Sequence, residues 1–256
     1  MTFLGLLLAV VMGLALGLLG GGGSVLAVPI LLYALDFGAK QAVAASLVVV
    51  GLTSLFGAAE HLRKGRVNLR VALVFGPIAA AGAYLGAHLS GFLSGEAQLS
   101  LFAAVMLAAA FFMLRDGETG KSDENHPSND SAGRLLLRFA LPGSGVGLLT
   151  GLVGVGGGFL VVPALVLLGG IPMEAAVGTS LLVIAMNSFA GFAGYLGKAE
   201  IPWGIVSVFA ALSVAGTFAG AYLAHFVPER ALKRAFAVFL IGMALFILYE
   251  NGGGLF

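Results

Sequence analysis

Apolar residues in this chain lie in eight long runs, and most polar residues are confined to the short stretches between them. The runs cover approximately residues 3–35, 41–59, 68–91, 97–114, 136–168, 175–194, 203–224 and 235–249. A helix needs about 20 apolar residues to cross the hydrocarbon core of a membrane. Six of the runs therefore suit one crossing each, although the fourth and eighth are short. The first and fifth are too long for one straight crossing and too short for two.

Both of the long runs carry a glycine-rich motif in their middle. Residues 20–29 read GGGGSVLAVP, and residues 154–163, which lie 134 positions later, read GVGGGFLVVP. Each glycine inside a helix costs about 1 kcal/mol relative to alanine, so several together should break the helix. A broken backbone inside a bilayer is tolerated only where protein or a wet cavity surrounds it. A break that occurs twice at matching positions points to the binding site of a transporter.

The two halves of the chain are related to each other beyond this motif. At the same shift, AVAASL at residues 42–47 matches AVGTSL at residues 176–181, and Ser54 matches Ser188. A polar stretch, rich in charged and small residues, separates the halves. We therefore expect a first transmembrane repeat over residues 1–114, a flexible polar cytoplasmic linker over 115–134 and a second repeat over 135–256.

The basic residues indicate how the repeats are oriented, because cytoplasmic loops carry an excess of Lys and Arg. The loop after the second run has four basic residues, Arg63, Lys64, Arg66 and Arg70. The corresponding loop of the second half has only Lys198. The loop after the third run has none, but its counterpart has three, which are Arg230, Lys233 and Arg234. Inverted repeats would place both basic loops on the cytoplasmic side.

Inversion requires an odd number of crossings in each half. The simplest solution is that each glycine-broken run enters the membrane and returns as a re-entrant helix pair, and that three transmembrane helices follow. The predicted fold is thus an all-α integral membrane protein with two inverted four-segment repeats, and both termini lie outside. In the alternative topology the broken runs cross, which gives eight crossings with both termini inside.

Helix N-termini carry partial positive charge and bind anions, and we expect two of them to begin at Ser24 and Gly158. The substrate-binding candidates are the motif glycines together with the few polar residues near mid-membrane. They are Gly21, Gly22, Gly23, Ser24, Ser46, Ser54, Gly156, Gly157, Gly158, Thr179, Ser180, Asn187 and Ser188. The alternative for the glycines is that they only permit a tight crossing, and the alternative for each hydroxyl is a bond to a carbonyl one turn earlier. The matched pair Ser46 and Ser180 is the strongest candidate among the hydroxyls.

No Lys or Arg lies deep inside an apolar run, so dipoles and hydroxyls rather than a salt bridge would hold the anion. Histidine is the side chain that changes charge near neutral pH, so His61 and His88 are candidates for proton coupling. The alternative for both is an interfacial side chain with a wet tip.

Composition supports a multi-pass membrane protein, since 59% of the residues are hydrophobic and only 10% are charged, against about 25% in soluble domains. The start of the chain has no basic region typical of a removed signal peptide. The chain has no cysteine, and it lacks HExxH, GxSxG and phosphate-loop motifs. We expect no enzyme activity, no cofactor and no metal. The expected partners are a small anion and membrane lipid, without nucleic acid, in a monomer or homodimer.

The motifs at residues 19–29, 153–163 and 176–181 resemble those of the sulfite exporter family TauE/SafE over essentially the whole chain. The resemblance implies a prokaryotic inner-membrane permease that usually exports small sulfur-containing anions, such as sulfite, sulfoacetate and other organosulfonates. The halves differ at the expected site, because Ala45 stands where the second half has Thr179, and Ser24 where it has Gly158. A passive anion channel or a carboxylate permease of the same fold is the alternative.

Overall fold

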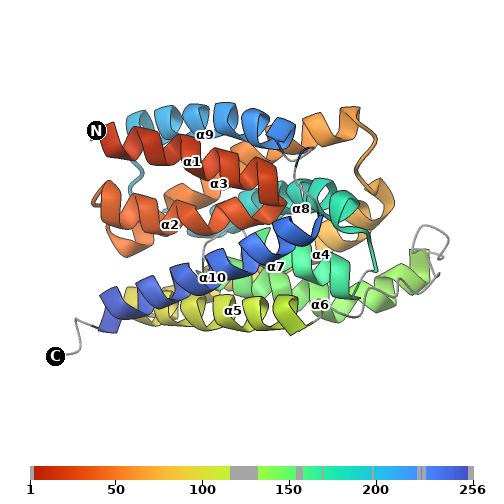
Figure 1. Cartoon of the computed structure of the whole chain (residues 1–256). Helices are drawn as coiled ribbons and strands as arrows, with labels where there is room; N and C mark the ends of the chain where they lie inside the picture. The colour runs from red at the N-terminus through yellow and green to blue at the C-terminus, as the bar shows by residue number, and fades with distance from the viewer. Residues whose placement is uncertain are drawn as a thin grey trace.

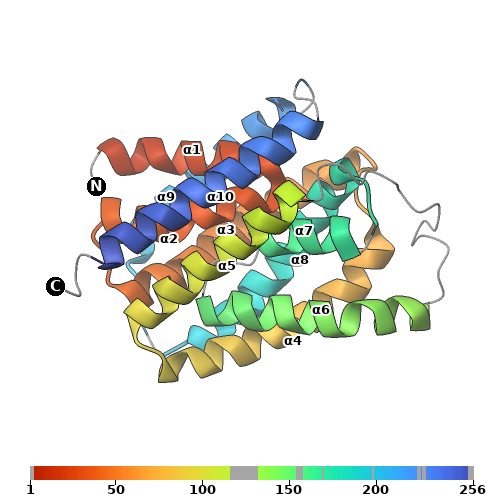
Figure 2. The same cartoon turned by 60° about the horizontal axis from the view of Figure 1, so that its bottom comes forward.

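The structure is a computed structural model that describes residues 3–115, 132–153, 158–168, 170–197, 199–223, 226 and 229–252. Every regular element within these ranges is helical, which confirms the predicted all-α class. Most of the expected linker, and also Gly156 and Gly157, lie outside the described residues. The longer helices lie side by side in a bundle, with both chain ends at one end of it (Figures 1 and 2).

The long helices and the π-helices follow one another in corresponding order in the two halves. The first half contains α1 (Phe3–Leu19), the 3-10 helix η1 (Gly20–Leu26), α2 (Ala27–Pro29), the π-helix η2 (Ile30–Ala34), α3 (Ala39–Arg63), α4 (Leu69–Leu89), η3 (Ser90–Phe92) and α5 (Gly95–Arg115). The second half contains α6 (Ala132–Val153), α7 (Gly158–Pro163), the π-helix η5 (Ala164–Leu168), α8 (Met173–Tyr195), α9 (Trp203–Leu223) and α10 (Glu229–Gly252). Counterpart helices such as α4 and α9 therefore lie 134 positions apart, which is the shift between the two glycine motifs.

The glycine run ends the first helix and reverses the chain. α1 ends at Leu19, and Gly20 follows with a φ of 64°, a left-handed conformation that costs glycine little. Gly23 then lies against Leu16, so the segment from η1 to η2 runs back along α1. The break is thus confirmed, but its form differs from our expectation. The glycines form a 3-10 helix and the α-helix resumes only at Ala27, not at Ser24, whereas α7 does begin at Gly158.

The two halves pack through reciprocal pairs of helices. α1 lies along α9, and α6 lies along α4, as Figures 1 and 2 show. Counterpart helices also pair, α3 with α8 and α5 with α10. Gly51 of α3 lies against Ser188, whereas Gly57, further along α3, lies against Leu181. Positions therefore rise along α3 as they fall along α8, so these two counterpart helices are antiparallel.

Small residues allow the cross-half pairs to approach closely. A Cβ added to Gly147 of α6 would lie 2.8 Å from the Cα of Ala79 in α4 and closer still to its carbonyl oxygen. In the α1–α9 pair, Gly13 lies in the same way against Ser213. The Ser213 hydroxyl donates to the carbonyl of Ala9 across this pair, at 3.0 Å. These spaced glycines are packing positions, as is usual for small residues in membrane helices.

A side chain from another helix caps the end of α6. The last carbonyls of a helix have no partner within it. The Gln98 Nε2 atom donates to the Leu152 carbonyl at 2.8 Å, and Gln98 is only 2% exposed. The same Nε2 also donates to the Tyr195 hydroxyl at 3.2 Å. Gln98 thus ties α5 to the end of the helix that precedes the second glycine run.

Replacing Gln98 by leucine should lower the stability by about 1–2 kcal/mol, because the buried Leu152 carbonyl would lose its donor. The measurement is the melting temperature of the purified protein in detergent. Gln41→Leu is the matched control, since the Gln41 Nε2 also donates to a carbonyl at 2.8 Å, that of Glu200, but at the surface. Water can replace that bond, so we expect a smaller change. Equal losses in the two variants would contradict the capping role.

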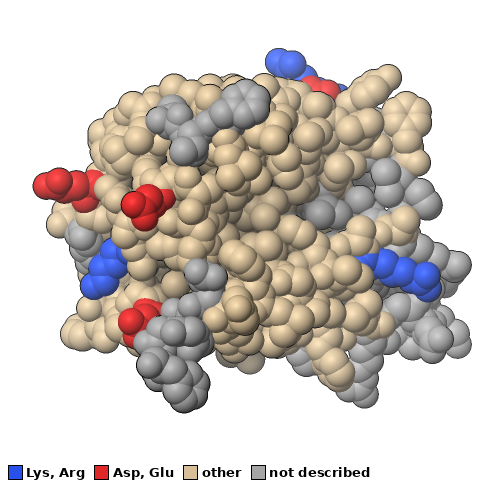
Figure 3. Space-filling model, turned by 60° about the vertical axis from the view of Figure 1, so that its left-hand side comes forward, with Lys and Arg blue, Asp and Glu red and all other residues tan. Residues whose placement is uncertain are grey.

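The surface matches a membrane environment. Four helical spans are long and apolar enough to cross a membrane, Ala39–Arg63, Leu69–Phe92, Ala175–Tyr195 and Trp203–Leu223. Large apolar side chains point outward, and Phe92 and Leu141 are 88% and 83% exposed. Uncharged side chains cover most of the view in Figure 3. Such a surface is stable in lipid rather than in water, so the fold is that of a multi-pass membrane protein.

Candidate functional site

The two glycine breaks meet inside the molecule. Gly21 of η1 and Gly158 of α7 touch through their backbones, and a Cβ added to Gly158 would lie 2.7 Å from the Cα of Gly21. η1 also packs on α8. Only glycine allows two backbones to approach in this way. The structure therefore brings together two segments that lie far apart in the sequence, at the boundary between the halves.

Ser24 and Ser180 lie next to this meeting point. Ser24 is buried, and its hydroxyl donates to the Gly21 carbonyl at 2.7 Å, which holds the 3-10 turn. A Cβ added to Gly20 would lie 3.2 Å from the Ser180 Oγ. Of the candidate glycines, Gly23 packs against α1 instead.

Several candidate hydroxyls bond to their own helix. The Ser46 hydroxyl donates to the Val43 carbonyl at 2.7 Å, and the Ser180 hydroxyl donates to the Val177 carbonyl at 2.8 Å. The Thr179 hydroxyl donates to the Ala175 carbonyl at 2.6 Å and accepts a bond from the Asn68 backbone N–H at 2.9 Å. A hydroxyl has one hydrogen to donate. In this conformation these three residues have no donor left for an anion.

Three other candidates are buried without any hydrogen-bond partner. The Ser54 hydroxyl, both polar atoms of the Asn187 amide and the Ser188 hydroxyl are unpaired, and all three residues are 0% exposed. We call Ser54, Asn187 and Ser188 the polar set. Leaving a buried polar group unpaired costs about 1–3 kcal/mol, and such a group in a native structure calls for an explanation.

The polar set lies near the middle of the antiparallel α3–α8 pair. Asn187 and Ser188 are neighbours on α8, and the Cβ of Ser188 is 3.3 Å from a Cβ added to Gly51 of α3. Ser54 is one helical turn beyond Gly51. Ile184, one turn before the α8 pair, reaches within 2.8 Å of a Cβ added to Gly158. Asn187 and Ser188 therefore lie one turn of α8 beyond the residue whose side chain reaches Gly158.

The two halves contribute unequal numbers of residues to the polar set. Ser54 and Ser188 are counterparts, but Asn187 corresponds to Thr53. The Thr53 hydroxyl donates to the Val49 carbonyl at 2.6 Å and is satisfied. The second half therefore supplies most of the free hydrogen-bonding capacity. The Thr53–Asn187 difference is visible in the sequence, but only the structure shows that Thr53 is hydrogen-bonded and Asn187 is not.

The surroundings of the polar set are electrically neutral. Among the described residues, no Lys, Arg, Asp or Glu is buried, and the buried polar side chains are those of Ser, Thr, Asn, Gln and one His. Donors that carry no charge can bind an anion and still release it. The neutral core expected from the sequence is thus confirmed for the described residues.

The two candidate histidines do not join the polar set. His61 is 4% exposed near the end of α3 and packs against Gly178 of α8. It lies about 10 Å along the helix axis from Ser54. His88 is exposed near the end of α4, and its ring packs against that of Tyr84 at 4.9 Å. His88 therefore fits the interfacial alternative, and proton coupling through His61 stays a prediction.

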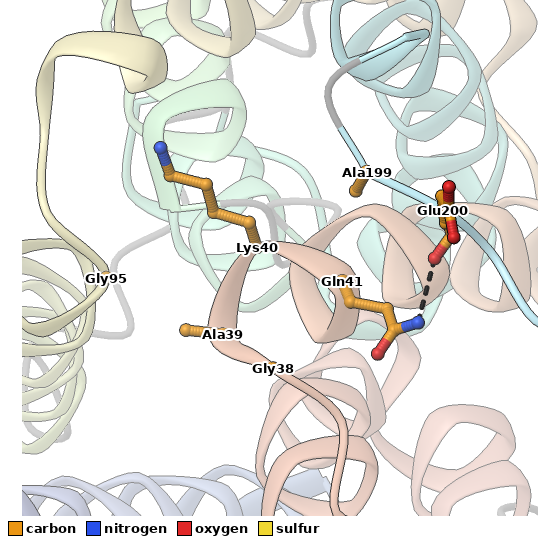
Figure 4. A pocket seen from close by; sticks show the side chains of 7 residues that line it. All are labelled: Gly38, Ala39, Lys40, Gln41, Gly95, Ala199 and Glu200. Atoms are coloured by element: carbon orange, nitrogen blue, oxygen red, sulfur yellow. Dashed lines mark hydrogen bonds between the residues drawn. The ribbon is translucent and has the colours of Figure 1, made fainter.

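One pocket is lined by residues at the starts of α3 and α5 and by Ala199 and Glu200, which precede α9 (Figure 4). Its volume is about 440 Å³, and its charged lining residues are Lys40 and Glu200. Within the described part of the chain, Lys40 makes no ion pair. Sequence reasoning missed this pocket, because residues 38–41, 95 and 199–200 lie in three separate segments and share no motif. One lysine beside one glutamate gives the pocket no net charge.

Comparisons with known proteins agree with the membrane fold. The family model described as sulfite exporter TauE/SafE matches residues 5–247. A probable membrane transporter protein of Xylella fastidiosa (strain Temecula1) is 32% identical over 250 residues, which cover 95% of this chain and 93% of that protein. The probable membrane transporter protein YdhB of Bacillus subtilis is 25% identical over 236 residues, with coverages of 90% and 93%. No solved structure matches the chain significantly. The chain therefore belongs to the TauE/SafE sulfite exporter family of membrane transporters.

Proposed function

We propose that this protein is a secondary transporter that exports small sulfur-containing anions, such as sulfite, sulfoacetate or another organosulfonate, across the prokaryotic inner membrane. The observation that carries the proposal is the polar set, whose buried amide and hydroxyls have no partner and lie beside the meeting point of the two glycine breaks. The description of the matching family supports the class of substrate.

The polar set offers the hydrogen bonds that an oxyanion needs. The Asn187 amide has two N–H donors, and Ser54 and Ser188 have one hydroxyl donor each. Gly21 and Gly158 have no side chains that would keep a ligand from the backbone. The helical segments that follow the breaks add partial positive charge at their N-terminal ends. Together these groups bind an anion without neutralising it, so it can leave on the other side.

The arrangement of the halves supports an inverted repeat. In an inverted repeat, counterpart helices run in opposite directions across the membrane, and α3 and α8 are antiparallel. α1 and its return segment would form the re-entrant pair of the first half. Alternating access would follow from one half rocking against the other around the fixed site.

Charge distribution supports a cytoplasmic location for the end of the bundle where α3 ends and α4 begins. The described basic residues at this end, next to the α3–α4 loop and the start of α10, are Arg63, Lys64, Arg66, Arg70 and Arg234. The opposite end has Lys40 together with Asp36, Glu96 and Glu200. Lys and Arg gather in cytoplasmic loops. The termini would then lie outside, and the negative-inside potential would favour anion exit by about 2.3 kcal/mol per charge per 100 mV.

Single-cysteine labelling tests this topology, and the natural chain has no cysteine that would give background. Lys40→Cys should react with an impermeant maleimide in intact cells. Lys64→Cys and Arg234→Cys should react only after the membrane is opened, because they would face the cytoplasm. Labelling of Lys64→Cys and Arg234→Cys from opposite sides would rule out the inverted repeat.

The binding proposal is tested by thermal unfolding of the purified protein with sulfite, sulfoacetate, thiosulfate, acetate or chloride. A ligand that binds only the folded state raises the melting temperature with occupancy. Stabilisation by a sulfur oxyanion alone supports the proposed substrate class, whereas stabilisation by acetate alone indicates the carboxylate permease. Flux in proteoliposomes then separates the two kinds of transport, since a transporter saturates and exchanges and a channel does neither.

Two serines on α8 provide a matched comparison for the same assay. Ser188→Ala should weaken anion affinity about tenfold, because it removes a free donor worth about 1–1.5 kcal/mol. Ser180→Ala should have a smaller effect, since its hydroxyl already donates to the Val177 carbonyl. A larger loss of affinity in Ser180→Ala than in Ser188→Ala would mean that the Ser180 hydroxyl rotates towards the ligand. The sequence-based preference for Ser46 and Ser180 would then be right.

A further inference from the structure

We infer that the polar set takes singly charged oxyanions and excludes dianions, so that sulfite is carried as hydrogensulfite. The inference rests on the proposed function and narrows its substrate class. It depends on three observations, which are the neutrality of the site, the number of its free donors and the free acceptor on Asn187.

The first argument is the cost of burying charge. The desolvation free energy of an ion grows with the square of its charge. It is therefore about four times as large for a dianion as for a monoanion of the same size. A buried charge normally requires a partner of opposite sign. Within the described core no Lys or Arg is buried, and Arg63, the nearest basic residue along α3, lies about 13 Å along the axis from Ser54. A second negative charge would therefore remain uncompensated.

The second argument is the number of donors. Ser54, Asn187 and Ser188 together have four N–H or O–H hydrogens free. Four neutral hydrogen bonds can satisfy the three oxygens of a singly charged sulfonate group. The same four bonds would have to replace the much tighter hydration of a dianion such as sulfate. Ser46 and Ser180 add none in this conformation, because both donate to backbone carbonyls.

The third argument is the Asn187 carbonyl oxygen, which is a buried acceptor without a donor. Whichever way the amide is turned, one end of it is an acceptor. An oxyanion without an O–H group leaves this acceptor without a donor. An acid anion such as hydrogensulfite has an O–H group that can donate to it. The site thus fits a ligand that carries one negative charge and one proton.

The test compares affinities in the purified protein for methanesulfonate, which has one charge at every relevant pH, sulfate, which has two, and sulfite, whose second proton titrates near neutral pH. Methanesulfonate should bind at least about tenfold more tightly than sulfate. The apparent affinity for total sulfite should fall about tenfold per pH unit above its second ionisation, in proportion to the hydrogensulfite fraction. Sulfoacetate, which carries two charges, should bind weakly.

Methanesulfonate is also the control for titration of the protein. Among described residues of α3, α8, η1, α7 and α4, the groups that could titrate are His61, Tyr195, Tyr84 and His88, together with charged residues at the helix ends. A change in their protonation would alter methanesulfonate and sulfite binding alike. A pH effect confined to sulfite therefore reports the charge of the ligand.

The outcomes separate this inference from the proposed function. Sulfate binding as tight as that of methanesulfonate, or sulfite affinity that stays constant with pH, would overturn the inference and leave an anion transporter. If no sulfur oxyanion binds at any pH, the proposed function fails as well. Asn187→Leu should abolish hydrogensulfite binding, and binding retained in that variant with the same pH dependence would overturn the role given to the amide.

Discussion

Gly147→Ala is expected to destabilise the protein by about 3 kcal/mol or more, whereas Gly145→Ala, two positions away on α6, should leave it as stable as before. The added methyl group at Gly147 would overlap the carbonyl of Ala79 in α4. Backbone atoms cannot move aside as a flexible side chain can, so α4 and α6 would have to separate. Overpacking of a dense interior typically costs 1–3 kcal/mol, and here the neighbouring close contact of Gly151 with Ala83 would be lost too.

Gly145 is the matched control, because nothing lies within 4 Å of a Cβ added there. Alanine favours the helix more than glycine, so this substitution should be neutral or slightly stabilising. The measurement is the melting temperature of the three proteins in the same detergent. Gly13→Ala in α1, which would meet Ser213 of α9, should repeat the result for Gly147. Equal melting temperatures for the Gly145 and Gly147 variants would show that the α4–α6 contact can open without cost.

The repeat and its breaks were predictable because they depend on local properties of the chain. Glycine runs weaken helices wherever they occur, and α1 does end one residue before Gly20. The shift between the halves also placed counterpart elements correctly, since α4 covers residues 69–89 and α9 covers 203–223. What the sequence could not provide is the pairing of α1 with α9 and of α6 with α4, which depends on how distant helices dock.

The choice among the polar candidates was not predictable either. Serine within a helix can donate to a carbonyl of the preceding turn or point to a neighbour, and the sequence is the same in both cases. Ser46 and Ser180 were favoured because they match between the halves, yet their hydroxyls are engaged with the backbone. Asn187 had no such match, and it stands out only when its buried amide is found without a partner.

Asn187→Leu is expected to abolish anion binding while leaving the stability unchanged or raising it. The amide is fully buried and neither of its polar atoms is paired, so it carries an unmet cost of about 1–3 kcal/mol in the unliganded protein. Leucine has a similar size and no polar atom, and should fit the same buried position. The gain in stability and the loss of binding have the same origin, because the free donors that destabilise the empty site are those that bind the ligand.

Thr179→Val provides the contrast, since it also replaces a buried polar residue of α8 by an apolar one. Thr179 is satisfied, and it accepts the Asn68 backbone N–H at 2.9 Å. Removing the Thr179 hydroxyl should therefore lower the melting temperature, because the backbone N–H of Asn68 would lose its acceptor. Both variants are measured without ligand and then with a saturating sulfur oxyanion. A loss of stability in Asn187→Leu as large as that in Thr179→Val, with binding retained, would make Asn187 a structural residue. Unchanged stability with no ligand-induced stabilisation would place the amide in the binding site.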